Sequence, residues 1–252
     1  MKRVLVIVPF PMGEENLLKR RQQMNAVRLG ADLEFDFRPV RIAPANYVSQ
    51  HDSVLADIGI LEAGINAQQE GYSAVCIDTM SDSGLSALRA VLDIPVIGPG
   101  RHAMLTALML GEKFSILAMW ERWRHLYRKT LAELNLTDKC ASVRSAGLQP
   151  NNQSLLAGKE AEFFPALYET AMRCITEDGA DVIILGSTTM HEAHEYLASR
   201  LPVPVINPGP LTYRLADAAI KLKLTHSRLA YPSPVESAHA RLSLMGGQAA
   251  SF

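Results

Sequence analysis

The sequence contains one stretch twice, and this repeat restricts the ways in which the chain can fold. The copies span residues 74–107 and 181–216 of the 252-residue chain. Each copy begins with an apolar run rich in β-branched residues, continues through a hydroxyl-rich turn and a helical pattern, and reaches PVIGPG at Pro95 or PVINPG at Pro204. Similarity repeated after 109 residues indicates that one α/β unit has been duplicated, and it argues against a solenoid of short repeats.

Strand and helix patterns alternate along both halves of the chain. Apolar runs predict strands at residues 4–8, 33–40, 74–77, 96–97, 114–119, 141–145, 182–185 and 205–206. Amphipathic patterns between them predict helices at residues 14–29, 52–70, 83–92, 102–110, 121–134, 159–178, 191–200 and 211–222. We therefore expect an α/β fold, with two Rossmann-like α/β/α halves whose parallel strands are joined by right-handed crossovers.

The same pattern predicts how the chain divides. We expect residues 1–98 together with 211–252 to form the first half, and residues 99–210 to form the second. The polar stretch at 148–158 predicts a mobile loop. After Leu224 the helical pattern fades, and Tyr231-Pro232-Ser233-Pro234 predicts an extended tail that packs across the other half.

Composition excludes several classes of protein. With 48% hydrophobic residues, 20% charged residues and a formal net charge of −1, the chain can bury a large core and has no overall field that attracts nucleic acid. The apolar run near the N-terminus is too short to span a membrane and ends at Pro9, so we interpret it as a strand. Three cysteines without a CxxC pair suit a reducing compartment. We expect a cytoplasmic protein that binds neither nucleic acid nor membrane.

The two hydroxyl-rich turns are the best candidates for a site. Ligands of open parallel sheets bind beyond the carboxyl ends of the strands, and both turns follow predicted strands. Each turn leads into a predicted helix, whose free N–H groups and dipole suit a carboxylate or another small anion. Serine and threonine at a helix start are most often caps. However, two equivalent turns are what a site in a cleft between two halves requires. The turns contain Thr79, Ser81 and Ser83, and Ser187, Thr188 and Thr189.

Three segments carry a resemblance to a known family. They are DTMSDSGLSALR followed by PVIGPG, KFSILAM after Leu110-Gly111, and GADVIILGSTTM followed by PVPVINPG. In order and spacing they resemble the aspartate/glutamate/hydantoin racemase superfamily, and within it the hydantoin and allantoin racemases, over nearly the whole chain. The resemblance implies two α/β halves related by pseudo-twofold symmetry, no cofactor, a homo-oligomer, and one cysteine from each half acting on opposite faces of a substrate carbon.

This chain has hydroxyls where the resemblance places those cysteines. Thr79 stands at the first position, which in the family opens a Cys-x-x-Asp-x-Gly-Leu pattern, and Ser187 stands at the second, in Leu-Gly-Cys. Cys76 lies three residues before Thr79, inside a predicted strand, and Cys174 lies on a predicted helix. We interpret both cysteines as buried small hydrophobes and not as nucleophiles.

Two further positions differ from the family pattern. Val8-Pro9-Phe10 replaces an Asn-Pro-Asn-like end of the first strand. Arg101 replaces a glutamate that many hydantoin racemases carry after the Gly-x-Gly turn. An arginine at a strand end predicts either an anionic substrate or an internal carboxylate partner, such as Asp82 or Asp78.

The replacement of thiols by hydroxyls changes the chemistry that the turns can perform. An aliphatic hydroxyl titrates about five pKa units above a cysteine thiol, which amounts to ~7 kcal/mol and exceeds what general acid–base catalysis supplies. Thr79 and Ser187 are therefore expected to donate hydrogen bonds to a substrate anion, or one of them to act as a nucleophile with a separate base. The candidate bases are His191, one helical turn after Ser187, and Asp82 and His102.

The resemblance implies a cofactor-free isomerase or racemase, and we expect it to hold a small carboxylate or hydantoin-like cyclic amide between Thr79 and Ser187. A hydrolase or lyase that uses the same hydroxyls as nucleophile or oxyanion donors is one alternative, and a non-catalytic binder of small molecules is another. His191 and His194 lack the spacing of the HExxH zinc helix, so we expect no metal. The candidate substrate-binding residues are Pro9, Phe10, Met80, Ser81, Arg101, Met119, Trp120, Thr188 and Thr189.

Overall fold

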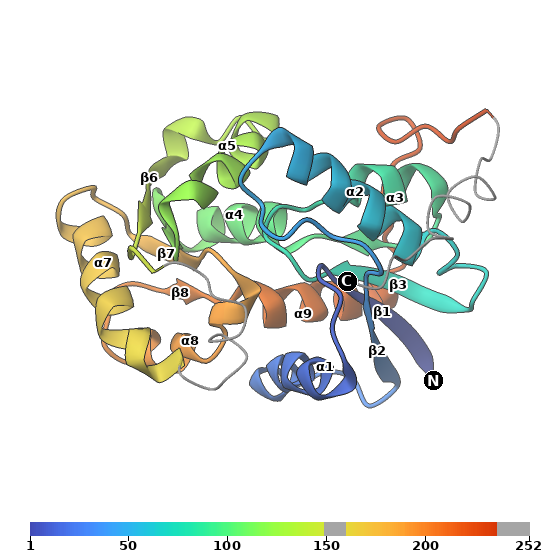
Figure 1. Cartoon of the computed structure of the whole chain (residues 1–252), viewed down its shortest axis with the longest axis horizontal. Helices are drawn as coiled ribbons and strands as arrows, with labels where there is room; N and C mark the ends of the chain where they lie inside the picture. The colour runs from blue at the N-terminus through green and yellow to red at the C-terminus, as the bar shows by residue number, and fades with distance from the viewer. Residues whose placement is uncertain (149–159, 236–252) are drawn as a thin grey trace. The chain divides into compact units, whose positions relative to one another are not determined.

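The computed structural model describes residues 1–148 and 160–235, and the chain divides into two compact units (Figure 1). The first unit comprises Met1–Asp78, Ser83–Gly98 and Thr212–Phe252, and the second comprises Thr79–Asp82 and Pro99–Leu211. The turn Thr79–Asp82 thus belongs to the second unit, whereas the sequence-based division assigned it to the first. From residue 149 onwards, the predicted loop at 148–158 lies outside the described residues.

Each unit contains a four-stranded parallel sheet. In the first unit the strand order is β2-β1-β3-β4, with β1 at Lys2–Val8, β2 at Leu33–Pro39, β3 at Tyr72–Ile77 and β4 at Val96–Ile97. In the second unit the order is β6-β5-β7-β8, with β5 at Phe114–Ala118, β6 at Cys140–Ser145, β7 at Val182–Leu185 and β8 at Val205–Ile206. The α/β fold with parallel sheets is confirmed, and β1 corresponds in sheet position to β5 as β3 does to β7.

Helices cover both faces of the sheet in the first unit. These helices are α1 (Glu14–Arg21), the 3-10 turn η1 (Gln22–Ala26), α2 (Gln50–Gly64), α3 (Leu85–Val91) and α9 (Pro208–Leu222). Successive residues of a strand point to opposite faces. Leu5 and Ile7 accordingly pack against α2 and α3, whereas Val4 and Val6 pack against α1 and α9.

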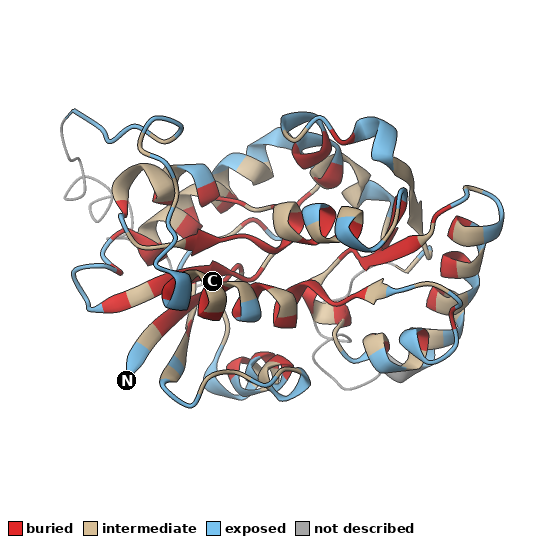
Figure 2. Cartoon of the chain, turned by 180° about the vertical axis from the view of Figure 1, so that it is seen from behind, coloured by how far each residue is buried: buried red, intermediate tan, exposed pale blue. Residues whose placement is uncertain are grey.

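The second unit has the same three layers. Its helices are α4 (Pro99–Leu110), α5 (Arg124–Glu133), α7 (Phe164–Thr176) and α8 (Ala193–Ala198), with 3-10 turns η2 (Glu121–Trp123), η3 (Thr137–Lys139), η4 (Glu160–Phe163) and η5 (Thr188–Met190). Ile116 and Ile184 pack against α4 and α5, and Leu117 and Leu185 pack against α7 and α8. Buried residues follow the strands and the helix faces that meet them (Figure 2).

Several helix boundaries differ from the predicted ones. The helix predicted at 14–29 ends at Arg21, because the chain tightens into η1. The helix predicted from Asp52 begins at Gln50, and its cap is Ser49. The Ser49 hydroxyl accepts a bond from the Asp52 N–H, and the Asp52 carboxylate accepts one from the Ser49 N–H. Within the described ranges, no helix has the length and apolar character needed to cross a bilayer.

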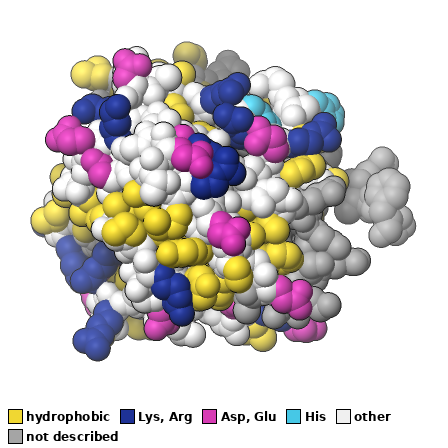
Figure 3. Space-filling model, turned by 90° about the vertical axis from the view of Figure 1, so that its left-hand side faces the viewer, with side chains coloured by type: hydrophobic (Ala, Val, Ile, Leu, Met, Phe, Trp, Pro, Cys, Tyr) yellow, Lys and Arg dark blue, Asp and Glu magenta, His cyan; other side chains and the backbone are white. Residues whose placement is uncertain are grey.

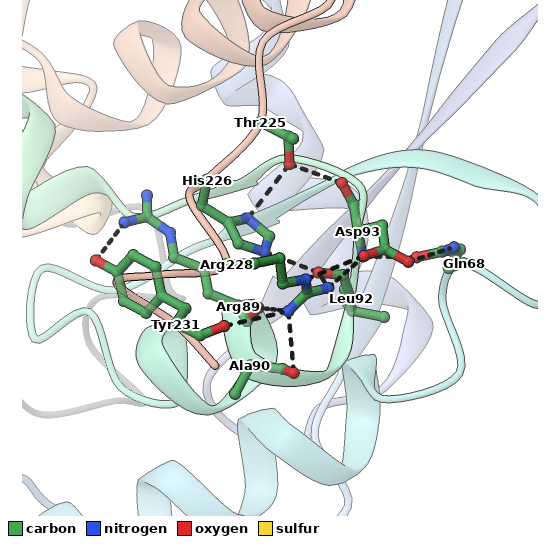
Figure 4. A network of polar contacts seen from close by, with 9 residues as sticks. All are labelled: Gln68, Arg89, Ala90, Leu92, Asp93, Thr225, His226, Arg228 and Tyr231. Carbon is green, nitrogen blue, oxygen red and sulfur yellow. Dashed lines mark hydrogen bonds and ion pairs between the residues drawn. The ribbon is translucent and has the colours of Figure 1, made fainter. Parts of the chain in front are cut away.

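The segment after α9 is attached to the end of α3 (Figure 4). Arg228 Nη1 donates to the carbonyl oxygens of Arg89 at 2.7 Å and Ala90 at 3.0 Å. These carbonyls lie in the last turn of α3, where a helix leaves its acceptors without intrahelical partners. Tyr231 accepts a bond from Arg89 Nη1 at 2.9 Å. The predicted tail therefore packs on the first unit.

Candidate active site

The turn after β3 holds two hydroxyls beside each other. Thr79 Oγ1 lies 3.2 Å from Ser81 Oγ, and the Asp82 N–H closes the turn onto the Thr79 carbonyl at 3.1 Å. Asp82 has a left-handed backbone, with φ of 50°. Its carboxylate oxygens accept bonds from the backbone N–H groups of Gly100 at 2.9 Å and Arg101 at 2.7 Å. Asp82 thus holds the turn against the N-terminus of α4, where a negative charge is favourable.

Gly100 allows this close approach of the turn to α4. A Cβ at position 100 would lie 2.3 Å from the carbonyl oxygen of Met80, which no side chain can tolerate. Met80 itself is only 3% exposed and packs in the core of the second unit. Its side chain is therefore part of the support of the turn.

The turn after β7 repeats the arrangement of hydroxyls. Ser187 Oγ lies 2.7 Å from Thr189 Oγ1 and accepts a bond from the Thr189 N–H at 3.2 Å, so Ser187 caps η5. Thr188 is buried. His191 follows η5 as its C-cap, and its carbonyl oxygen accepts a bond from the side chain of Asn207 at 3.4 Å. Ser187 therefore has the more common role of such a hydroxyl, that of a helix cap.

Tyr127 forms a hydrogen bond with the residue at the start of this second turn. Its hydroxyl donates to the carbonyl oxygen of Gly186 at 2.7 Å, and burial raises the pKa of Tyr127, so the hydroxyl keeps its proton. Gly186 has no room for a side chain, because a Cβ would lie 2.7 Å from both the Leu117 carbonyl oxygen and the Tyr127 hydroxyl. The residue before Ser187 is thus held by β5 and α5 together.

The three cysteines do not supply a thiolate. Cys76 and Cys174 are fully buried, and burial raises the pKa of both thiols. Burial also raises the pKa of Cys140 to about 12. All three thiols therefore stay protonated near neutral pH, and a protonated thiol is a poor nucleophile. This agrees with the interpretation of Cys76 and Cys174 as buried small hydrophobes.

The expected carboxylate partner of Arg101 is a different residue from those predicted. Arg101 Nη2 lies 3.3 Å from Glu133 Oε2 at the end of α5, while Asp82 binds only the Arg101 backbone N–H among the bonds described above. Arg101 thus has an internal carboxylate partner, as one of the two predictions had it, but the partner is Glu133 and not Asp82 or Asp78. The reason is that Asp82 faces the helix terminus, and Asp78 pairs with Arg20.

Three further predicted residues fall in two groups. Trp120 packs edge-to-face on Trp123 at 6.3 Å and lies under the Arg122 guanidinium at 5.4 Å, both in the second unit. Pro9 and Phe10 belong to the first unit. There the Pro9 carbonyl oxygen accepts a bond from Tyr47 at 3.2 Å, and the Phe10 ring packs edge-to-face on the Tyr47 ring.

His194 is a structural residue. Its Nε2 lies 3.1 Å from the Val205 carbonyl oxygen, so the ring bridges α8 to β8. Among residues 1–148 and 160–235, no group of three His, Cys, Asp or Glu side chains has the arrangement of a metal site.

The family model of Asp/Glu/Hydantoin racemases matches residues 17–216 of this chain. The chain belongs to this family. A hydantoin racemase of Pseudomonas sp. (strain NS671) is 27% identical over 191 residues, which cover 75% of each chain. A hydantoin racemase of Paenarthrobacter aurescens is 28% identical over 197 residues, which cover 77% of this chain and 81% of that one.

A solved structure agrees with this assignment. The allantoin racemase from Klebsiella pneumoniae superposes with a TM-score of 0.84 at 25% identity, covering 94% of this chain and 96% of that chain. Nearly all of the chain therefore has the same fold as that racemase.

The sequence analysis did not predict a buried polar cluster around Asp78, the residue that precedes Thr79 in the chain. Arg20 Nε donates to Asp78 at 3.0 Å, Arg20 Nη2 donates to the same oxygen, and Gln23 lies 3.4 Å from it. Tyr213 of α9 is buried beside them, and burial together with the charge of Asp78 raises its pKa. The available signal was Asp78 itself, an acid that ends an otherwise apolar strand.

Proposed function

We propose that the chain is a cofactor-independent racemase, or an isomerase of that kind, acting on a small carboxylate or a cyclic amide such as a hydantoin. Membership of the family over residues 17–216 supports this class of reaction. The observation that carries the proposal is the pair of matching turns. Each places two hydroxyls close together directly after a buried strand, at 3.2 Å in one turn and 2.7 Å in the other, and both turns belong to the second unit.

Racemisation requires a base to take a proton from the stereogenic carbon and another proton to arrive, here from water, on the opposite face, after which the base returns its proton to water. The electron pair that the first proton leaves behind moves onto the adjacent carbonyl oxygen, which becomes an enolate oxygen. Hydrogen-bond donors aimed at that oxygen stabilise the charge as it develops. We assign this role to Thr79 and Ser187, whose hydroxyls are oriented by Ser81 and Thr189.

A separate group has to accept the proton, because a serine or threonine hydroxyl is too weak an acid to be ionised at neutral pH. We assign this role to His191, since a neutral imidazole can accept a proton near neutral pH. His191 directly follows η5, whose cap is Ser187. Asp82, the other base predicted near Thr79, is a weaker candidate for this role, because both of its carboxylate oxygens accept bonds from the first turn of α4.

The experiment that tests the reaction class is incubation with 5-substituted hydantoins and amino acids in D₂O. Deuterium at the stereogenic carbon, with the substrate otherwise unchanged, is the expected result. A product of different composition would point to a hydrolase or a lyase. Stabilisation of the protein against heat without any turnover would point to a binding protein.

Two alanine variants test the roles of the hydroxyls. If both are donors to the developing charge, Ser187→Ala and Thr79→Ala each lower kcat/KM by roughly 10²–10³-fold, as removal of an oxyanion donor does. If Ser187 is a nucleophile, Ser187→Ala abolishes turnover whereas Thr79→Ala only weakens it. Ser199→Ala, an exposed serine at the end of α8, is the matched control and should be silent. Full activity in both site variants would contradict the assignment.

A further inference from the structure

The second hydroxyl turn is bonded at both of its ends by side chains of the second unit. At its start, Tyr127 donates to the carbonyl oxygen of Gly186, the residue before Ser187. At its end, Asn207 Nδ2 donates to the carbonyl oxygen of His191 at 3.4 Å, a long hydrogen bond. Asn207 directly follows β8, which pairs with β7, the strand that leads into the turn. The proposed base is therefore in contact with a polar side chain from the neighbouring strand.

The packing around His191 is largely apolar. Met190 and Ala193, on either side of it, lie in the apolar core between the sheet and the helices α7 and α8. Hydrophobic side chains also gather on the face of the second unit that carries α7 and α8 (Figure 3). The His191 carbonyl oxygen accepts the His194 N–H at 3.3 Å as well. Apolar contacts are non-directional, so the bond from Asn207 adds an orientation that packing alone does not impose.

Asn207 is a buried amide whose oxygen does not cap the following helix. The residue is 8% exposed, and its Oδ1 is buried without a hydrogen-bond partner among residues 1–148 and 160–235. An asparagine before a helix ordinarily accepts the N–H of the second or third helical residue. Helix α9 begins Pro208-Gly209-Pro210, and a proline has no N–H. Since Oδ1 accepts nothing from Gly209 either, capping does not explain this side chain.

The two copies of the repeated stretch differ at both residues of this contact. PVIGPG has Gly98 where PVINPG has Asn207. Four residues after the first hydroxyl of each turn, the first copy has Ser83 and the second has His191. The copy with the imidazole thus also has the amide that contacts it. A requirement of the shared fold would apply to both copies, so this pair of differences indicates that the two residues act together.

We propose that Asn207 is a positioning residue for His191. This inference rests on the proposed function, in which His191 takes the proton from the stereogenic carbon. The amide nitrogen of Asn207 holds the backbone of His191. The amide oxygen shares a carbon with that nitrogen, so it also lies close to His191, and its negative partial charge favours the positive charge that the ring acquires with the proton.

Kinetics of the variant Asn207→Leu measure the effect on the reaction. A base must lie within hydrogen-bond reach of the proton that it takes, so a displaced His191 slows proton transfer and leaves binding unchanged. We expect kcat to fall by at least ~10-fold while KM stays within about twofold. Asn66→Leu changes an exposed asparagine of the first unit and should leave both constants unchanged.

A double variant separates positioning from a general structural effect. If Asn207 acts through His191, the change Asn207→Leu has little left to disturb once His191 is replaced by glutamine. In the His191→Gln background, we therefore expect it to lower the remaining rate of deuterium exchange by less than about twofold. The same loss in both backgrounds would show that Asn207 acts independently of His191, and it would overturn the inference.

The variant Asn207→Asp gives a measurement that needs no activity. It keeps the shape of the side chain and places a carboxylate beside His191. NMR titration of the His191 ring should show a pKa raised by about 1 relative to the unchanged protein, because a nearby negative charge favours the protonated imidazole. Asn66→Asp should leave the pKa of His191 where it is. Glu192 and His194 are the same in every variant, so the difference reports on position 207 alone.

An unchanged pKa of His191 in Asn207→Asp would overturn the inference. This titration also decides the question if thermal unfolding shows that Asn207→Leu does not fold. An increase in KM with kcat unchanged would make Asn207 a substrate-binding residue, and it would likewise overturn the positioning role.

Deuterium exchange by the unchanged protein separates this inference from the proposed function. If Asn207→Asp raises the pKa of His191 but no hydantoin or amino acid exchanges deuterium, the positioning of His191 holds and racemisation fails. If the unchanged protein exchanges deuterium while the variants leave kcat and the pKa unaltered, racemisation holds and the positioning role of Asn207 fails.

Discussion

At the scale of single residues, a hydroxyl that caps a turn still has hydrogen-bonding capacity left. A serine hydroxyl has one proton to donate and two lone pairs. Ser187 Oγ accepts the Thr189 N–H, and when it also accepts the Thr189 hydroxyl, its own proton remains for a ligand. Thr79 has the equivalent neighbour in Ser81. Capping and substrate binding are therefore compatible, because the cap fixes the direction in which the remaining proton points.

Tyr127 tests how the second turn is supported. Tyr127→Phe leaves the buried carbonyl of Gly186 without the bond that Tyr127 donates at 2.7 Å. Leaving a buried acceptor unsatisfied costs about 1–3 kcal/mol, so urea unfolding should show a loss of stability of that size. We expect a loss of activity as well, because Gly186 precedes Ser187. Tyr168→Phe is the control, since the described residues offer its hydroxyl no hydrogen bond. Equal stability of the two variants would show that the Tyr127 bond contributes nothing.

Arg20 and Asp78 form a charge pair whose side chains are only 7% and 1% exposed. Arg20→Met leaves the Asp78 carboxylate buried without its cation, and breaking such a pair from one side costs about 3–5 kcal/mol. The double variant Arg20→Met with Asp78→Leu removes both charges and should recover most of the loss, because no charge then remains buried. Chemical denaturation of both variants measures this. A double variant as unstable as the single one would mean that the pair itself, and not the unpaired charge, determines the cost.

At the scale of helices and strands, local patterns predict the sheets better than the helix ends. The strands at 182–185 and 205–206 were predicted to the residue, since an apolar run within a parallel sheet is visible in sequence. Helix α4 was predicted from His102 but begins at Pro99. Its first turn is stabilised by Asp82, a contact that spans eighteen residues of sequence. No local pattern contains that contact.

The candidate site divides in the same way. Each hydroxyl pair lies within three residues of sequence, so both turns could be found from the repeat alone. The apolar pocket that Met119 and Phe163 line beside Thr189 could not, because these two residues come from segments far apart in the chain and meet only in the folded unit. Arg20 and Asp78 are likewise far apart in sequence, and a helical pattern does not show which of its charged residues turns inward.

The C-terminal segment makes the stability of the protein depend on pH through His226. Its Nε2 lies 2.8 Å from the Leu92 carbonyl oxygen, and burial lowers its pKa from the ordinary value of 6.5. Between the folded pKa and 6.5 the unfolded chain therefore binds more protons than the folded one. The contribution of His226 is complete above pH 6.5 and is lost as the pH falls through the folded pKa.

We accordingly expect limited proteolysis after α9 to accelerate as the pH falls from 7 to 5, because the segment detaches more often when His226 is protonated. The variant His226→Gln can still donate to Leu92 but cannot titrate. Its cleavage rate should change less over the same range. Equal cleavage rates of the wild-type protein and the variant at every pH would show that protonation of His226 does not control detachment of the segment.

At the scale of the whole molecule, two helices pack in a different unit from the sheet that precedes them in the chain. Helix α4 follows the last strand of the first sheet, yet it packs in the core of the second unit. Helix α9 follows the last strand of the second sheet, yet Tyr213, Ala216 and Ile220 pack against the first sheet. Each unit is therefore completed by the helix that follows the other unit's sheet.

This arrangement predicts different behaviour for two fragments of the chain. A fragment of residues 1–98 lacks α9, so one face of its sheet, with Val4 and Val6, would be exposed to water. Exposure of that much apolar surface removes a large part of the driving force for folding. A fragment of residues 99–211 keeps α4, α5, α7 and α8 and both covered faces of its sheet.

We expect fragment 99–211 to unfold cooperatively in urea and fragment 1–98 to show no cooperative transition. Co-expression of fragment 1–98 with residues 208–235 should restore its transition, because those residues supply α9 and the segment that binds α3. Cooperative unfolding of fragment 1–98 on its own would show that α9 is dispensable for the first unit.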